Sequence, residues 1–270
     1  MQAEDTGFET GLAAWQNARL AELSAPESWL GLAGLFWLEP GRNALGTAAD
    51  CPLRLPAGPA RAGEVVWAPG EGTLVWLPLA GEPQALATDQ QGLPTTVDLE
   101  NWSFFVVDRE QRLALRLRDR DWAKTRPFAG LDYFPTAPEW RIEAAWQALE
   151  QPLQIEVPNV AGELRPVNIA WQAVFEYDGS QVCLLPMAVD ENEVFFVFRD
   201  RSSGRDSYGA GRFLKAARPQ GASITLDFNR AYNPPCAFTP FATCPLPPPE
   251  NWLPFAVTAG ELKYAGAAGH

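Results

Sequence analysis

The residues most suited to forming a binding site are concentrated in one polar segment late in the chain, DFNRAYNPPCAFTPFATCP at residues 227–245. Its first seven residues bring carboxylate, amide, guanidinium and phenol groups together, and Pro234-Pro235 then stiffens the backbone. A rigid loop that presents such groups suits a preorganised site. The candidate ligand-binding residues of this segment are Asp227, Asn229, Tyr232 and Asn233. The alternative is a structural plug, in which the polar side chains satisfy backbone groups and the phenylalanines fill the core.

A second polar segment, RDRSSGRDSYGAGRF at residues 199–213, carries four arginines within a chain of net charge −12. Guanidinium groups match the geometry of carboxylates and phosphates, so the segment indicates a small anionic ligand. The candidate residues here are Arg199, Asp200 and Arg212. We expect Arg212 to converge with residues 227–236 in one site. The alternative is a solvated turn whose charges neutralise one another.

Catalysis is the competing interpretation, and the scarcity of histidine restricts it. The one histidine of the chain is His270, in the small-residue sequence AGAAGH, so Ser-His-Asp and Cys-His catalysis and imidazole zinc sites lack a required residue. A histidine-free enzyme, for example a hydrolase, would use Asp227 or Cys236, with Arg212 stabilising an oxyanion. Cys244 would then resolve Cys236 through a disulfide, whereas inert buried packing is the alternative for both thiols. We expect no metal site and no cofactor.

The composition predicts a folded protein that binds neither nucleic acid nor membranes. Hydrophobic residues make up 47% of the 270 residues and include 11 Trp and 15 Phe, which is enough apolar material for a core. The net charge of −12 disfavours binding to a phosphate backbone, which requires clustered Lys and Arg. No run of about 18 apolar residues is present, and the first residues, MQAEDTGFET, have neither a basic start nor an apolar signal core. We therefore expect a cytoplasmic protein that takes a small anionic ligand or a protein partner, with the oligomeric state left open.

The elements that must position the polar segments are predicted to be mainly β-strands. A helical lead is expected at residues 1–28, a small β-sandwich-like unit at 29–125, and a second β-barrel or sandwich unit at 126–264 that ends in a proline-rich segment. Residues 265–270 are expected to form a flexible tail. The scattered 25 Pro and 22 Gly fit short strands joined by many turns.

Side-chain alternation supports these strands. In LALRLRD at 113–119, leucines alternate with a set that includes Arg116, which predicts one buried and one solvated face. Apolar residues alternate along 167–177, which predicts one long strand. Asp178-Gly179 then predicts a tight hairpin onto the sequence QVCLL.

Four longer sequences carry a family resemblance. They are SWLGLAGLFWLEPG at 28–41, DYFPTAPEWRIEA at 132–144, FFVFRDRSSGRDSYGAGRFL at 195–214 and DFNRAYNPPCAFTPFATCPLPPPENWLP at 227–254. With AGE at 259–261, they make the chain resemble a conserved bacterial and archaeal family of unknown function from Trp29 to Glu261. The family usually has Thr where this chain has Ser202 and Ser207, which keep the hydroxyl group. The resemblance implies no established activity, cofactor or catalytic residue.

Residues 38–119 are similar, in addition, to a forkhead-associated β-sandwich. The similarity lies in a Gly-Arg-Asn-x-Leu-Gly start at 41–46 followed by short strands. In that family an Arg follows the second Gly and a His helps to bind phosphothreonine, whereas here Thr47 follows Gly46 and the His is absent. The resemblance therefore implies a scaffold role without phosphopeptide binding. A purely structural protein, in which the polar side chains contribute only stability, is the third possibility for the whole chain.

Overall fold

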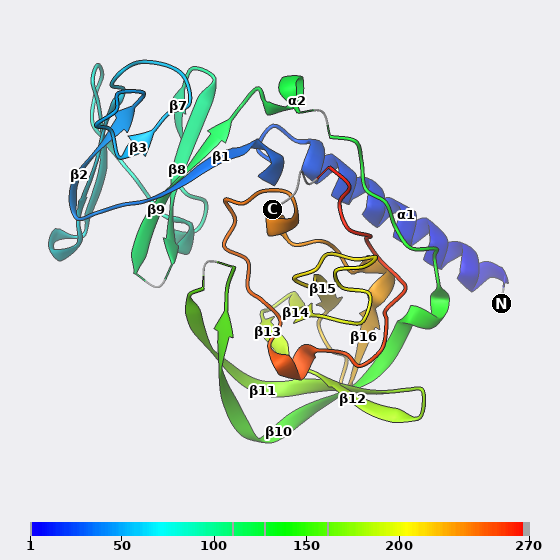
Figure 1. Ribbon diagram of the computed structural model, residues 1–270. Coiled ribbons are helices and arrows are strands. Elements are labelled where there is room, and N and C mark those ends of the chain that lie inside the picture. Colours follow the sequence, from blue (N-terminus) through cyan, green and yellow to red (C-terminus); the bar gives the residue numbers. More distant parts are fainter. Residues whose placement is uncertain (1, 110, 127, 161, 267–270) are drawn as a thin grey trace. The chain divides into compact units, whose positions relative to one another are not determined.

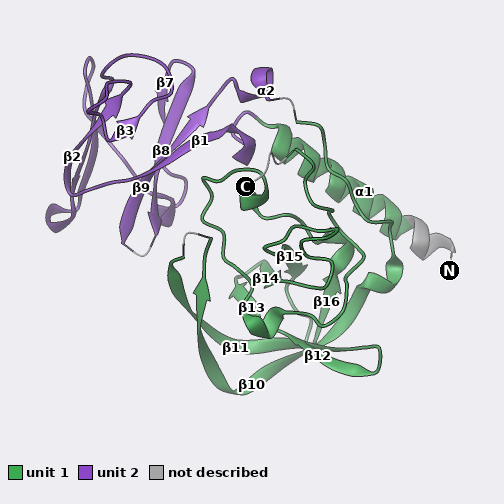
Figure 2. Cartoon of the chain, in the orientation of Figure 1, with its two compact units in different colours: residues 1–25, 128–270 green, residues 26–127 purple. Residues whose placement is uncertain are grey.

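The chain is mainly β with an N-terminal helix, which confirms the predicted fold class. The computed structural model describes residues 2–109, 111–126, 128–160 and 162–266, with side chains from residue 7 onward. Residues 267–270 of the predicted tail lie outside the described residues. No helix in the described ranges has the length and apolar content needed to cross a membrane. The chain divides into a sandwich unit, Pro26–Pro127, and a larger unit that combines Met1–Ala25 with Phe128–His270 (Figure 1, Figure 2).

The sandwich unit is built from two sheets, with strand orders β1-β9-β8-β7 and β3-β2-β4-β5-β6. Its strands are β1 (Leu32–Trp37), β2 (Gly41–Gly46), β3 (Leu53–Arg54), β4 (Gly63–Ala68), β5 (Thr73–Pro78), β6 (Gln84–Ala85), β7 (Val97–Leu99), β8 (Trp102–Arg109) and β9 (Arg112–Asp119). Its helices are η1 (Trp29–Gly31), η2 (Pro69–Glu71), η3 (Asp89–Gln91) and α2 (Trp122–Thr125). Leu45, Val65 and Trp76 of one sheet and Phe104 and Leu115 of the other are buried in one core. The two sheets therefore pack face to face.

The outer face of β9 differs from the sequence prediction, because Arg116 is buried rather than solvated. The carbon of its guanidinium lies 5.2 Å from the centre of the Trp29 ring. Trp29 belongs to η1, which precedes the strand that pairs with β9. Alternation within one strand detects which face is apolar, and it does not reveal that a distant aromatic residue covers the polar face.

The larger unit also contains two sheets, with strand orders β12-β11-β10-β16 and β13-β14-β15. Its strands are β10 (Arg141–Pro158), β11 (Leu164–Tyr177), β12 (Ser180–Leu184), β13 (Pro186–Val189), β14 (Glu193–Phe198), β15 (Arg212–Ala217) and β16 (Ser223–Asp227). Its helices are α1 (Gln2–Ser24), η4 (Pro138–Trp140), η5 (Phe228–Arg230), η6 (Pro235–Ala237) and η7 (Pro249–Asn251). The predicted hairpin is confirmed, since Asp178 and Gly179 have φ angles of 50° and 72° between the paired strands β11 and β12.

The core of the larger unit is centred on Phe228, which is fully buried. Its ring centre lies 5.3 Å from that of Phe198 on β14, 5.9 Å from that of Trp140 and 6.2 Å from that of Phe175 on β11. Rings from both sheets therefore meet at one residue of η5. Figure 1 shows the long strands β10 and β11 curving around this core.

Asn251 attaches the proline-rich C-terminal segment to the strands. Its side-chain oxygen accepts a hydrogen bond from the Leu185 N–H at 2.8 Å, and its side-chain nitrogen donates to the carbonyls of Leu185 and Val197, both at 2.8 Å. Asn251 is fully buried, so these bonds replace water at every partner. They fix the segment that follows, residues 252–255, beside β12.

Candidate functional site

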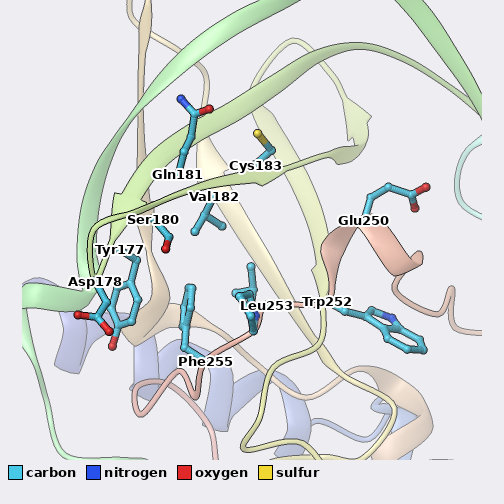
Figure 3. A pocket seen from close by; sticks show the side chains of 11 residues that line it. Tyr177, Asp178, Ser180, Gln181, Val182, Cys183, Glu250, Trp252, Leu253 and Phe255 are labelled. Carbon is cyan, nitrogen blue, oxygen red and sulfur yellow. The ribbon is translucent and has the colours of Figure 1, made fainter.

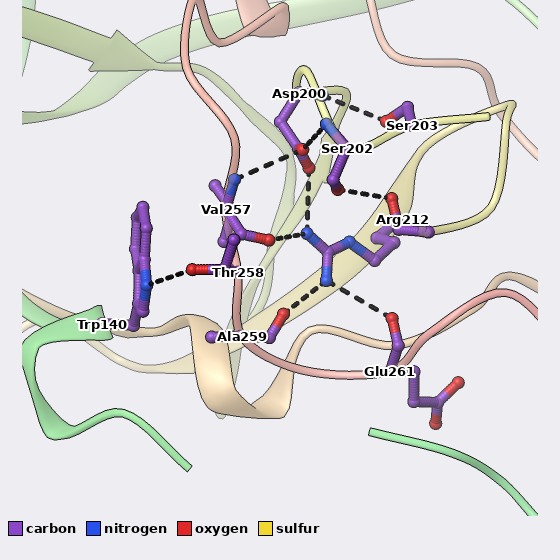
Figure 4. Close-up of polar contacts among 10 residues, drawn as sticks. Trp140, Asp200, Ser202, Ser203, Arg212, Val257, Thr258, Ala259 and Glu261 are labelled. Carbon is purple, nitrogen blue, oxygen red and sulfur yellow. Dashed lines mark hydrogen bonds and ion pairs between the residues drawn. The ribbon is translucent and has the colours of Figure 1, made fainter. Parts of the chain in front are cut away.

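Polar side chains of the larger unit gather in two places. One is a buried polar centre around Arg212, and the other is an open pocket beside β12. Arg212 is the first residue of β15 and has no exposed surface. It donates to the carboxylate of Asp200 at 2.9 Å, to the carbonyl of Val257 at 2.8 Å and to the carbonyl of Ala259 (Figure 4). The second oxygen of Asp200 accepts from the N–H groups of Ser202 at 2.7 Å and Val257 at 3.3 Å.

This arrangement follows from the irregular backbone of residues 257–261. That segment forms no ladder with a strand, so its buried carbonyls need other donors. A guanidinium supplies several donors in one plane, and the two carbonyls and Asp200 use them. Burial lowers the pKa of Arg212, while the charges of Asp200 and Glu261 act in the opposite direction. Arg212 is held by these internal contacts and has no surface open to a ligand, although its Nε has no hydrogen-bond partner among the described residues.

Glu261 extends the same centre toward α1. It is fully buried, and its two oxygens accept from the Arg19 Nε at 3.1 Å and from the Asn233 N–H at 2.7 Å. Arg19 also donates to the carbonyl of Asn233 at 3.0 Å and lies over the Tyr232 ring, 4.8 Å from its centre. Burial raises the pKa of Glu261, and Arg19 and the Asn233 N–H offset part of that increase. These contacts tie the helix, the 227–236 loop and the C-terminal segment together.

The raised pKa of Glu261 gives a prediction for the pH dependence of stability. Because the folded chain holds this proton more tightly than the unfolded chain, the contribution is complete below the ordinary carboxyl pKa of 4.5 and is lost as pH rises through the folded value. We expect the stability advantage of the wild type over Glu261→Gln to be largest below pH 4.5 and to shrink as the pH rises through the raised folded pKa. Urea unfolding of both proteins across this range measures it. An advantage that grows with pH would contradict the prediction.

The structure brings some of the sequence candidates together and separates others. Residue Phe213, next to Arg212, exchanges two backbone hydrogen bonds of 2.9 Å with Tyr232, so β15 and the 227–236 loop lie side by side. Asn233 and Asp200 lie in the same buried centre, at opposite ends of it. The expected convergence of Arg212 with the loop is therefore present, in the interior of the unit rather than at its surface.

Asp227 and Asn229 form a separate group of hydrogen bonds, which attaches η5 to the chain just before η4. The side chain of Asn229 accepts from the Ala137 N–H and donates to the Ala137 carbonyl, both at 2.9 Å. Asp227 caps η5 by accepting from the Asn229 N–H at 3.2 Å, and its other oxygen lies 3.3 Å from Arg230 Nε. Asn229 is thereby bonded to the backbone of Ala137, and Asp227 is held by its cap and by the ion pair with Arg230.

The open pocket has a volume of about 420 Å³ and lies between β12 and the C-terminal segment (Figure 3). The residues that line it are Tyr177, Asp178, Ser180, Gln181, Val182, Cys183, Glu250, Trp252, Leu253, Pro254 and Phe255. It combines aromatic rings with carboxylates, a hydroxyl and an amide. No local pattern in the sequence pointed to it, because its two walls are more than 60 residues apart in the chain.

The walls of the pocket are fixed by stacked rings. Tyr177 and Phe255 stack with their centres 3.9 Å apart, and the buried Trp140 stacks behind both, at 5.1 Å and 6.2 Å. Arg201 donates to the Pro254 carbonyl. The pocket is therefore formed before any ligand binds, which lowers the entropic cost of binding.

Arg199 adds a cation at the rim. It is exposed, and its guanidinium carbon lies 5.4 Å from the ring centre of Trp252, which lines the pocket and is 54% exposed. The indole N–H donates to the Pro247 carbonyl at 3.0 Å, which fixes the ring. Among the residues that the structure describes, no carboxylate pairs with Arg199. Arg199, one of the eight sequence candidates, therefore contacts the pocket wall through Trp252.

Cys236 and Asp227, the candidates for catalysis, are not among the described residues that line the pocket. In the part of the chain that is described, no group of three or more His, Cys, Asp or Glu side chains is placed to hold a metal ion. The pocket lining contains aromatic rings and carboxylates, and the guanidinium of Arg199 lies over one of its residues, Trp252.

Comparison with known proteins points to one family. A family model described as "Protein of unknown function (DUF1684)" matches residues 126–262, which contain three of the four long signatures. The uncharacterized protein from gene locus rrnAC0354 of Haloarcula marismortui, solved by NMR, is 34% identical over 53% of this chain and 87% of its own, with a TM-score of 0.42. No curated protein matches the chain.

Proposed function

The chain belongs to this family of unknown function, and on that premise we propose that the larger unit is a binding module for a small anionic ligand, with the β12 pocket as its site. The observation that carries the proposal is the guanidinium of Arg199, which pairs with no carboxylate among the described residues and lies over the exposed ring of Trp252 in the lining of an aromatic pocket. The buried centre around Arg212 then acts as the scaffold that holds the pocket wall.

The aromatic walls favour a ligand with a flat or apolar face. Rings in a fixed stack present a rigid surface, and contact with Trp252 removes apolar area from water on both sides. A volume of about 420 Å³ suits a molecule of metabolite size.

The charges narrow the ligand class further. Arg199 favours one phosphate or carboxylate at the rim. Asp178 and Glu250 belong to the pocket lining; their carboxylates would accept hydrogen bonds from hydroxyl donors and repel a second anionic group. A ring with hydroxyl groups and one terminal phosphate, such as a hexose or pentose phosphate, meets all three requirements.

Catalysis receives less support from the geometry. Asp227 is committed to its cap and to Arg230, and Arg212 is committed to Asp200 and to backbone carbonyls. An oxyanion or a substrate carboxylate would have to displace these contacts. A hydrolase that uses Asp227 or Cys236 stays a prediction of the sequence alone, as do the cytoplasmic location and the absence of nucleic-acid binding.

A thermal-shift screen tests the proposal with hexose and pentose phosphates, their parent sugars and inorganic phosphate. A sugar phosphate at about 100 times its dissociation constant is expected to add about 2.7 kcal/mol to the unfolding free energy, which raises the melting temperature by several degrees. Arg199→Ala and Trp252→Ala are expected to abolish the shift. Both side chains are exposed, so neither substitution should prevent folding.

Arg205→Ala is the matched control, because Arg205 lies in the same polar segment, is exposed and pairs with Asp206 rather than with the pocket. It should bind like the wild type. The proposal is contradicted if no sugar phosphate stabilises the wild type, or if a stabilising one acts equally on Trp252→Ala.

A further inference from the structure

Two of the four cysteines, Cys236 and Cys244, contact each other within residues 227–254. The N–H of Cys236 donates to the sulfur of Cys244 at 3.2 Å, and both residues are buried in the reduced state. Eight residues separate them in the chain. This contact brings the Cys244 sulfur to the backbone of the residue with which it would form a disulfide.

The backbone holds both cysteines in place. Cys236 lies in η6, where the Ala237 N–H donates to the Pro234 carbonyl at 2.9 Å. On the other side, the Cys244 carbonyl accepts from the Val160 N–H at 3.0 Å. The pair is therefore part of the folded larger unit and does not depend on a chance encounter between loops.

Tyr208 completes the environment of the pair. Its hydroxyl donates to the Cys236 carbonyl at 3.1 Å. The pKa of the Cys236 thiol is lowered, first by its hydrogen bond with Cys244 and also by Tyr208, although burial acts in the opposite direction. Burial and the neighbouring thiols raise the pKa of Tyr208, so its hydroxyl keeps its proton and remains a donor. A thiol with a lowered pKa beside a second thiol is the arrangement of a reactive cysteine and its resolving partner.

The remaining cysteines do not share this environment. Cys183 is exposed on β12, and Cys51 lies in the sandwich unit, where its sulfur approaches the Ala60 carbonyl at 3.7 Å. Both supply internal references for any reaction of thiols.

We propose that Cys236 and Cys244 form a redox-active dithiol that hydrogen peroxide, or a similar small hydroperoxide, oxidises to an intramolecular disulfide. The Cys236 thiolate attacks one peroxide oxygen, the O–O bond breaks, and with one proton a sulfenic acid is formed together with water from hydrogen peroxide, or with an alcohol from another hydroperoxide. The Cys244 sulfur then attacks the Cys236 sulfur, the S–O bond breaks, and the hydroxyl leaves as water with the Cys244 proton. Two electrons pass from the sulfur atoms to the peroxide, and an added dithiol returns them.

This proposal is independent of the ligand site, since neither cysteine is among the described residues that line the β12 pocket. A negative result in the ligand screen would not contradict the dithiol proposal. A negative peroxide experiment would likewise not contradict the ligand site.

The test uses the double variant Cys51→Ser/Cys183→Ser, which retains only the proposed pair. After peroxide treatment, alkylation under denaturing conditions and mass spectrometry should show that both thiols are lost together, with the loss of two hydrogens and no added oxygen. Dithiothreitol should restore both. Peptide mapping of the wild type gives the same readout without any substitution.

Two further variants separate the roles of the residues. Cys244→Ser should accumulate a sulfenic acid on Cys236 that dimedone traps, and Tyr208→Phe should slow disulfide formation several-fold. The proposal is overturned if both thiols survive a dose of peroxide that oxidises the exposed Cys183 of the wild type. It is also overturned if the pair gains oxygen without forming a disulfide.

Discussion

Arg212→Ala is expected to lower the free energy of unfolding by about 3–5 kcal/mol, because it breaks a fully buried ion pair by removing one partner. Asp200 would remain buried without its counter-charge. The carbonyls of Val257 and Ala259 would lose their donor as well. An unpaired buried polar group adds to the cost, whereas the ion pair by itself adds little net stability.

Urea unfolding followed by tryptophan fluorescence measures this effect. Arg205→Ala is the matched control, since Arg205 is exposed and pairs with Asp206 at the surface. Its loss should change stability by less than about 0.5 kcal/mol. If Arg212→Ala costs no more than this control, the buried centre does not act as a scaffold.

Gly260→Ala is expected to lower the unfolding free energy by about 3 kcal/mol or more. Gly260 has a φ of 82°, which strains any residue with a β-carbon. A β-carbon here would also lie 2.5 Å from the Ala231 carbonyl oxygen and 2.8 Å from that of Phe228. Both atoms are backbone, so η5 would have to shift, and with it the contact of Phe228 in the core.

Gly221→Ala separates the cost of backbone strain from the cost of steric overlap. Gly221 has a φ of 65°, and a β-carbon there would meet nothing within 4 Å. It should cost about 1–2 kcal/mol from backbone strain alone. If both variants lower the free energy of unfolding equally, the close approach of residues 228–231 to Gly260 does not contribute to the cost of Gly260→Ala.

Much of the fold is predictable because its signals are local. The N-terminal helix, the long strand that ends at Tyr177 and the turn at Asp178-Gly179 each follow from periodicity or turn chemistry within a few residues. The two polar segments were also correctly selected as neighbours, since Phe213 pairs with Tyr232.

The burial of the polar side chains was not predictable from the same signals. Arg212 and Glu261 are both fully buried, because segments far away in the chain supply partners for them. A charged side chain is buried only where distant segments of the chain supply its partners, and neither composition nor residue spacing predicts those partners. The β12 pocket was missed for the same reason, since Tyr177 and Phe255 meet only after the C-terminal segment is attached through Asn251.

Hydrogen exchange of the wild type, with and without a stabilising sugar phosphate, tests the central claim most directly. Protection confined to residues 177–184 and 250–255 is the result predicted by a ligand in the β12 pocket, because these segments form its walls. Protection that is absent there, or that centres on the segments around Arg212 and Glu261, would contradict the assignment of the pocket as the site and of the buried centre as its scaffold.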